Sequence, residues 1–344
     1  MKTERRKFLK QAGLAGAVIA ASGSAAMKPD EAKAATAGKT AKSAAPVMPK
    51  NMMLLTMRAG DGHALGIKTE KGVLDVASAA KVFKSGAPTT MDALLAGGDQ
   101  GLTALRGKAL AAVNGKGLFV PEDEVEFGPC VTNPQKIVCV GLNYARHAKE
   151  VGQPLPKMPI LFNKFNTALN SHQGTVRVSS IPAMNFDYEA ELVVVIGRRA
   201  SNVSEAEALS HVFGYATGND FTARDLQSRS TQWMIGKACD GFAPVGPYLV
   251  TADLVGDPNS LKIECRVNGE VRQSSNTNDM VFNCAQIISY ASKLMTLEPG
   301  DMIFTGTPEG VISGYPKDKQ VWLKPGDRLT TTIEKLGELR FSLV

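Results

Sequence analysis

Two glutamates, Glu189 and Glu191, stand beside the apolar run LVVVIG and are the first residues whose spacing suggests chemistry. The run is typical of a buried strand, and side chains at positions i and i+2 of a strand point to the same face. Two carboxylates on one buried face repel each other and lose hydration. A hard divalent cation such as Mg²⁺, Mn²⁺ or Ca²⁺ offsets both costs, because these ions prefer oxygen ligands. A strand end that holds both carboxylates in solvent explains the spacing equally well.

A third carboxylate follows in the segment GNDFTARDLQ. Asp220 comes directly after a Gly-Asn turn and can supply a further oxygen donor. Arg224 and Gln227 share one face of any helix that follows this turn. An arginine in this place can bind a substrate carboxylate through two parallel hydrogen bonds. The alternative is an aspartate that caps a helix, beside an ordinary surface arginine.

The segment GLNYARHAKE follows the apolar strand pattern KIVCV and contains His147 and Glu150. Residues at positions i and i+3 are neighbours on one turn of a helix. A carboxylate beside an imidazole fixes its tautomer and raises its basicity, as a general-base pair requires. A solvated pair on a surface helix is the alternative interpretation.

Two further candidates lie in loops rich in glycine and proline. Lys237, in WMIGKACDGFAPVGP, stands between apolar residues and the loop, so it can be a partly buried cation that stabilises an oxyanion. Thr307, in FTGTPEG, follows a predicted strand, where hydroxyls and a glycine can form a small anion pocket. A surface lysine and a plain turn are the respective alternatives.

The elements that must position these residues are mostly strands. Short β-type runs punctuated by Gly, Pro, Asn and Asp dominate from Asn133 to the end, with helices predicted at 204–211 and 283–295. Residues 51–130 combine strand patterns with helical ones and contain an Asp-Gly hairpin signal. We therefore expect a β-rich α+β fold, with a small α+β N-terminal domain (51–130) and a catalytic domain (131–344).

The first residues read as a targeting segment. Arg5-Arg6 is followed by a run rich in Ala and Gly, and a small-x-small site allows cleavage before Ala35. This order is typical of a twin-arginine export signal, so residues 1–34 are predicted to be a signal peptide, 35–50 a linker, and the mature protein to be periplasmic or otherwise exported. The apolar run is too short and too rich in glycine to span a bilayer, so no membrane association is expected after cleavage. An uncleaved tail with a chance arginine pair is the alternative.

The charge distribution argues against a nucleic-acid partner. Of the formal net charge of +6, residues 1–34 contribute +4 and the rest of the chain only +2. A nucleic-acid-binding protein usually carries a basic stripe, and the sequence contains no cluster of Lys and Arg interleaved with aromatic residues.

Taken together and in this order, the motifs resemble those of the fumarylacetoacetate hydrolase family. The matching segments are GLNYARHAKEVG, ILFNKFNTALN, DYEAELVVVIG, GYATGNDFTARDLQ, GKACDGFAPVGP, LKIECRVNGEVRQSSNTNDMVF and FTGTPEGV, which cover nearly all of residues 134–344. The resemblance implies a mixed β-roll catalytic domain and a homodimer.

The resemblance also implies roles for individual residues. Glu189, Glu191 and Asp220 would be the metal ligands for Mg²⁺, Mn²⁺ or Ca²⁺, and His147 and Glu150 the pair that activates water. Lys237, Arg224, Gln227, Thr307 and Tyr144 would contact substrate. The founding enzyme has a further acidic ligand near the histidine motif, where this chain has Asn143. We therefore expect three protein ligands.

The predicted function is metal-dependent hydrolysis of a carbon–carbon bond in small 2-oxo or 1,3-diketo acids of the acylpyruvate type. Water activated by His147 and Glu150 would attack the carbonyl, Lys237 would steady the oxyanion, and a metal-stabilised enolate would leave. The alternatives within the family are a 2-oxo acid decarboxylase and a hydroxymuconate-type isomerase or lyase. An alternative from another class is an exported protein that binds metal or oxo acids without turnover.

Overall fold

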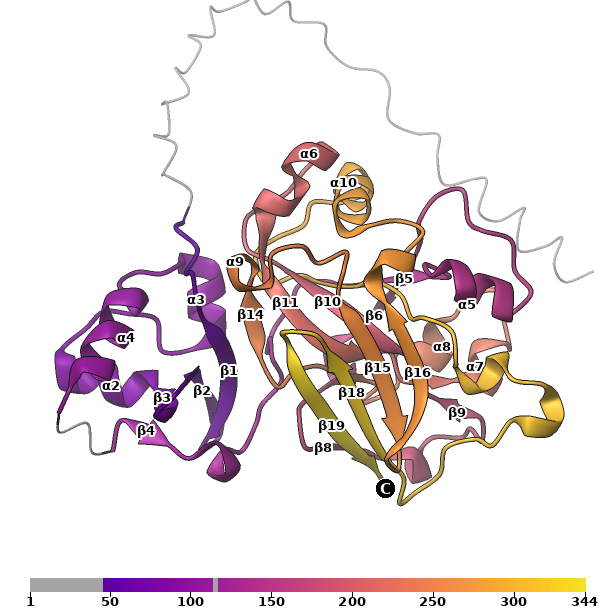
Figure 1. Ribbon diagram of the computed structural model, residues 1–344, viewed down its shortest axis with the longest axis horizontal. Coiled ribbons are helices and arrows are strands. Elements are labelled where there is room, and N and C mark those ends of the chain that lie inside the picture. Colours follow the sequence, from indigo (N-terminus) through magenta and orange to yellow (C-terminus); the bar gives the residue numbers. More distant parts are fainter. Residues whose placement is uncertain (1–45, 114–116) are drawn as a thin grey trace, which may run out of the picture. The chain divides into compact units, whose positions relative to one another are not determined.

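The computed structural model describes residues 46–113 and 117–344 (Figure 1). The predicted signal peptide and most of the predicted linker therefore lie outside the described residues. In the described part of the chain, most strands belong to two larger sheets, and two short pairs accompany them. No helix within these residues is long and apolar enough to cross a membrane.

The larger sheet has ten strands in the order β4-β3-β2-β1-β14-β11-β10-β17-β5-β6. β17 and β5 are parallel, and the other neighbours are antiparallel. The strands are β1 (Met53–Ala59), β2 (Gly62–Thr69), β3 (Gly72–Asp75), β4 (Phe119–Val120), β5 (Ile137–Gly141), β6 (Ile160–Lys164), β10 (Ala190–Ile196), β11 (Val212–Asn219), β14 (Leu249–Thr251) and β17 (Met302–Phe304). Every residue of β10 and β11 is buried, because both faces of the sheet are covered at its centre.

The second sheet has five strands in the order β16-β15-β18-β19-β8. They are β8 (Gly174–Val176), β15 (Lys262–Val267), β16 (Glu270–Asn276), β18 (Arg328–Ile333) and β19 (Gly337–Leu343). Along β15, buried Ile263, Cys265 and Val267 alternate with more exposed residues, so one face of this sheet is apolar. Their side chains belong to the same core cluster as Leu192 and Val194 of β10. The two sheets therefore share one core, and this core holds β10 and β11 in place. The short pairs are β7 (Leu169–Asn170) with β13 (Ala243–Pro244), and β9 (Phe186–Asp187) with β12 (Thr222–Ala223).

The helices are short. They are α2 (Val76–Phe83), α3 (Met91–Gly97), α4 (Leu102–Ala111), α5 (Ala145–Glu150), α6 (Glu205–Ala208), α7 (Arg224–Gln227), α8 (Met234–Lys237), α9 (Ala252–Val255) and α10 (Cys284–Leu294). The two predicted helical segments correspond to α6 with the turn that follows it and to α10, and each begins with a capping box.

The N-terminal residues contribute strands and helices, as predicted for an α+β segment. Strand β1 of this N-terminal segment pairs with β14, so the ten-stranded sheet continues from the segment into the rest of the chain. The hairpin between β1 and β2 turns at Gly60-Asp61, one residue before the Asp-Gly signal, because Ala59 pairs with Gly62. The boundary at residue 130 stays a prediction, since one sheet crosses it.

Candidate functional site

Three buried carboxylates meet where β10 begins and β11 ends. Single oxygen atoms of Glu189, Glu191 and Asp220 lie within 4.8 Å of one another. The antiparallel pairing of Ala190 with Asn219 places the two strand ends side by side, and the Asp220 amide donates to the Glu189 carbonyl at 2.8 Å. The three residues are 5%, 2% and 0% exposed. The alternative in which both glutamates lie in solvent is therefore wrong.

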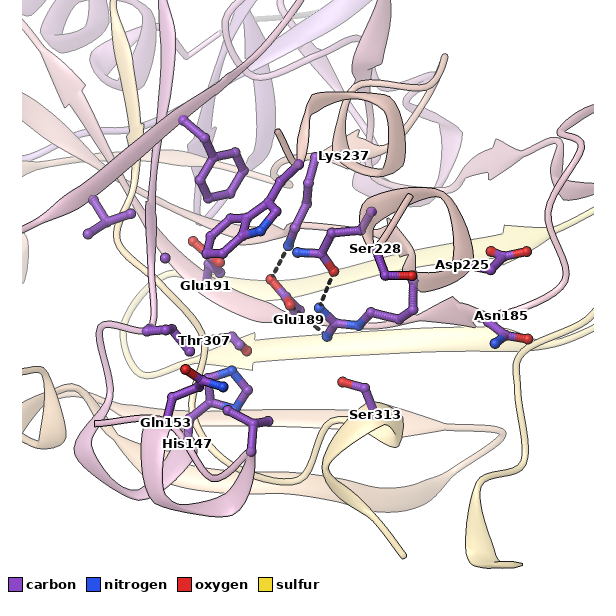
Figure 2. Close-up of a pocket in the computed structure, with 18 of the residues that line it drawn as sticks. His147, Gln153, Asn185, Glu189, Glu191, Asp225, Ser228, Lys237, Thr307 and Ser313 are labelled. Atoms are coloured by element: carbon purple, nitrogen blue, oxygen red, sulfur yellow. Dashed lines mark hydrogen bonds and ion pairs between the residues drawn. The ribbon is translucent and has the colours of Figure 1, made fainter. Parts of the chain in front are cut away.

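Three cations surround these carboxylates. Lys237 Nζ lies 2.7 Å from Glu189 Oε2 and 2.9 Å from Asp220 Oδ2, and Figure 2 shows the lysine pointing at Glu189. Arg224 Nη2 lies 2.6 Å from Glu189 Oε1. Lys164 Nζ lies 2.6 Å from Asp220 Oδ1. Glu189 and Asp220 are thus each paired with two cations.

Glu191 is the carboxylate that these cations compensate least. Burial tends to raise the pKa of Glu189, but Lys237 and Arg224 hold that pKa at about 2. Burial, followed by the charges of Asp220 and Glu189, raises the pKa of Glu191 well above its ordinary value. Glu191 is therefore the one carboxylate of the three that has no ion pair with these cations. An all-oxygen, carboxylate-rich set of this kind fits a hard divalent cation, so the donor chemistry is compatible with Mg²⁺, Mn²⁺ or Ca²⁺.

The predicted general-base pair, His147 and Glu150, lies on α5, and its histidine lines the cavity beside the carboxylates. His147 Nδ1 is 3.3 Å from Glu150 Oε2, and the other oxygen of Glu150 accepts a hydrogen bond from the Gly310 amide at 2.9 Å. His147 is 6% exposed and lines the cavity, so the alternative of a solvated surface pair is wrong. With Nδ1 donating to the carboxylate, Nε2 remains as the basic nitrogen, an assignment made from the hydrogen-bond network.

Arg224 and Gln227 line the cavity and also bind each other. Arg224 Nε donates to Asp187 Oδ2 at 2.8 Å and Nη1 donates to Gln227 Oε1 at 3.1 Å. Together with the Glu189 contact, every nitrogen of the guanidinium has a protein partner. Arg224 therefore holds the Glu189 side chain in place. The predicted hydrogen bonds from Arg224 to a substrate carboxylate would use its remaining N–H groups.

Thr307 and Tyr144 differ in their access to the cavity. Thr307 lines it, and its hydroxyl accepts a hydrogen bond from Gln273 Nε2 at 2.9 Å. Tyr144 is fully buried and is absent from the described residues that line the cavity. Asn143 donates to the carbonyls of Phe282 and Thr305. Its amide has a structural role in joining these segments.

The cavity that contains these groups has a volume of about 710 Å³. An apolar wall is formed by Val140, Leu142, Phe162 and Trp233. In Figure 2, His147 and Thr307 lie across the cavity from Lys237, with Glu189 and Glu191 between them. Seven of the ten predicted site residues line the cavity, and Tyr144, Asp220 and Glu150 do not. Asp220 contacts the lining residue Lys237, and Glu150 contacts the lining residue His147.

Sequence reasoning missed three supporting residues: Lys164, Gln273 and Asp187. Lys164 is fully buried and also donates to the carbonyls of Phe221 and Phe242. Gln273 donates to Thr307 and to the Pro308 carbonyl and accepts from the Ala190 amide. Their partners are distant in sequence, so local spacing carried no signal. Asp187 was within the motif DYEAE but was not singled out.

Comparison with known proteins identifies the family. Residues 136–344 match the model described as "Fumarylacetoacetate (FAA) hydrolase C-terminal". The chain therefore belongs to the fumarylacetoacetate hydrolase family. This membership identifies it as an enzyme. It has the expected α+β fold of that family, as its solved relatives also show.

Two kinds of relative are informative. The chain is 42% identical over 294 residues to the mitochondrial oxaloacetate tautomerase FAHD2A of Bos taurus, covering 84% of this chain and 90% of that protein. A putative HpcE protein from Mycobacterium smegmatis is 35% identical with a TM-score of 0.70, covering 85% of this chain and 99% of that one. Fumarylpyruvate hydrolase from Pseudomonas aeruginosa, solved with Mn²⁺ and pyruvate, is 37% identical with a TM-score of 0.55, covering 62% and 91%.

The predicted periplasmic location is wrong. The tautomerases of Bos taurus and Homo sapiens that match 84% of this chain are mitochondrial proteins, not exported periplasmic ones. A basic start followed by small apolar residues is shared by several kinds of targeting segment, so the arginine pair alone did not distinguish among them. Residues 1–34 lie outside the described part of the chain.

Proposed function

We propose that this chain catalyses the metal-dependent interconversion of the keto and enol forms of oxaloacetate or a similar 2-oxo acid. The observation that carries the proposal is that the carboxylate cluster, the buried Lys237 and the His147–Glu150 pair each contribute lining residues to one cavity. Similarity to oxaloacetate tautomerases over 84% of the chain supports this choice of reaction. We also propose that the chain works as a homodimer.

The residues divide the task between charge stabilisation and proton transfer. A divalent cation held by Glu189, Glu191 and Asp220 would act as a Lewis acid towards the oxo acid. His147 Nε2 takes the proton from the carbon next to the carbonyl and delivers it to the carbonyl oxygen, which forms the enol, and the reverse transfers restore the keto form. An imidazole near neutral pH can serve as both base and acid in these transfers. Glu150 holds the imidazole in the required tautomer. The Lys237 ammonium stabilises the negative charge that develops on oxygen.

A second candidate is the hydrolysis of a carbon–carbon bond in acylpyruvates. The cavity of about 710 Å³ favours it, because this space lies well within the range of sites that hold larger ligands, about 300–1,000 Å³. The similarity to a fumarylpyruvate hydrolase also supports it. In that reaction His147 and Glu150 would activate water instead of transferring a carbon-bound proton. Decarboxylation and hydroxymuconate-type isomerisation would use the same carboxylate cluster.

The test follows the ultraviolet absorbance of enol-oxaloacetate with purified protein, in Mn²⁺ or Mg²⁺ and then in excess chelator. Metal-dependent acceleration of the approach to equilibrium, without pyruvate formation, is the expected result. Pyruvate formed from oxaloacetate would indicate decarboxylation. Cleavage of acetylpyruvate to acetate and pyruvate without tautomerisation would favour the second candidate. Mn²⁺ binding without turnover of any of these acids would leave a binding protein and overturn the proposal.

A further inference from the structure

The helix that carries His147 and Glu150 has little intrinsic stability. α5 contains only six residues, and isolated helices shorter than about 12–15 residues are marginal in water. Of its residues, His147 and Ala148 are buried, while Arg146 and Lys149 are exposed. The position of the His147–Glu150 pair must therefore be set by contacts between α5 and the segments around it.

One short loop connects the His147–Glu150 pair with the carboxylate cluster. In the loop 306–310, which follows β17, the Gly306 amide donates to Glu191 Oε2 at 2.8 Å, and the Gly310 amide donates to Glu150 Oε1 at 2.9 Å. Both glycines have φ of +100°, and a Cβ on Gly310 would lie 2.2 Å from the Arg272 carbonyl oxygen. The chain path through this loop therefore depends on glycine at both ends. Any movement of α5 away from this loop separates Glu150 from one of its partners.

Arg146 joins α5 to this loop and to two further segments. Its Nη1 lies 3.1 Å from Glu309 Oε1, and its Nε lies 3.5 Å from Asp279 Oδ1. Asp279, at the end of the turn η5 (Thr277–Asp279), also accepts the Arg146 backbone amide at 3.0 Å. Arg146 Nη2 donates to Ser275 Oγ at 2.9 Å. The guanidinium thus bridges three segments in one network.

We propose that Arg146 is a positioning residue that holds α5 against the loop 306–310, and so sets the His147–Glu150 pair in register with the carboxylate cluster. This inference rests on the proposed role of His147 as the proton-transferring group. The Arg146 side chain is 54% exposed, and isolated exposed ion pairs contribute little to stability. Arg146 instead contributes to the placement of a short helix. Its planar guanidinium has several N–H donors, so it can bind Asp279, Glu309 and Ser275 at once.

The test compares Arg146→Ala and Arg146→Lys with the matched control Arg199→Ala. Arg199 pairs with Glu298 at 3.2 Å and is 64% exposed, so it is a similar arginine pair that does not line the cavity. We expect Arg146→Ala to lower kcat about three- to tenfold, with KM and Mn²⁺ affinity within twofold of wild type. Amide hydrogen exchange at residues 145–151 should become faster. Arg146→Lys should fall between, and Arg199→Ala should match wild type in every measurement.

Unchanged hydrogen exchange at residues 145–151 in Arg146→Ala would overturn the inference, because α5 would then be held without this network. A loss of Mn²⁺ affinity equal to the loss of kcat would also overturn it, since the effect would then act on the carboxylate cluster. Hydrogen exchange does not depend on the reaction. A wild-type protein without tautomerase activity would therefore refute the proposed function, while the exchange result would still decide whether Arg146 holds α5.

Discussion

Lys164 Nζ lies 2.6 Å from Asp220 Oδ1, and both side chains are fully buried. The lysine comes from the end of β6, and the aspartate from the turn after β11. The same ammonium donates to the backbone carbonyls of Phe221, Lys237 and Phe242, so each of its three protons has a carbonyl acceptor. Breaking a buried ion pair is costly, and loss of the lysine would leave Asp220 with Lys237 alone of its two cations.

Lys164→Met should therefore be strongly destabilising. Breaking one side of a buried ion pair costs about 3–5 kcal/mol, which urea unfolding of the metal-free protein can measure. Lys164→Met combined with Asp220→Asn removes both charges, so the double variant should recover part of the lost free energy of unfolding. A double variant less stable than Lys164→Met would show that the lysine acts mainly through its backbone acceptors.

Glu191→Gln should nearly abolish metal binding while the protein stays folded. The amide keeps the hydrogen bond from Gly306 and the shape of the side chain, but it removes a carboxylate ligand. Because burial and two neighbouring carboxylates raise the pKa of Glu191, the metal-free variant should be at least as stable as wild type. Titration with Mn²⁺ monitored by electron paramagnetic resonance, together with thermal unfolding, checks both points. Wild-type affinity and activity in this variant would exclude Glu191 as a ligand.

How far the sequence predicted this site depended on local spacing. Glu189 and Glu191 were paired correctly because strand periodicity puts positions i and i+2 on one face, and His147 and Glu150 because a helical turn joins positions i and i+3. Lys164 was not predicted, because its contact with Asp220 arises from the packing of distant segments and follows no periodic pattern. The continuity of the sheet from β1 to β14 was missed for the same reason.

His147→Gln should lower turnover without weakening the metal site. General acid–base catalysis by a positioned side chain contributes about 10²–10⁴-fold, so kcat should fall within that range while Mn²⁺ affinity stays near wild type. Glu150→Gln should cause a smaller loss, since the imidazole remains but loses the partner that fixes its tautomer. Equal losses of metal affinity in both variants would mean that this pair supports the carboxylates instead of transferring protons.

His172 should make stability depend on pH in a defined window. Burial, followed by the nearby charge of Arg340, lowers the pKa of His172 to about 4, and its Nδ1 accepts a hydrogen bond from the Arg340 amide at 3.2 Å. In the unfolded chain the pKa returns to about 6.5. Between these values the unfolded state binds more protons, so stability rises with pH across this window and falls on acidification.

His172→Phe should lose less stability than wild type between pH 6.5 and 4, because phenylalanine can pack on Phe127, whose ring centroid is 4.7 Å from that of His172, and cannot take up a proton. His211→Gln is the matched control. His211 Nδ1 lies 3.3 Å from the Arg198 carbonyl oxygen. Urea midpoints at several pH values give the slope for each protein. If His172→Phe kept the full wild-type slope while His211→Gln lost it, the acid sensitivity would belong to His211, and the hydrogen bond from Arg340 would not be its source.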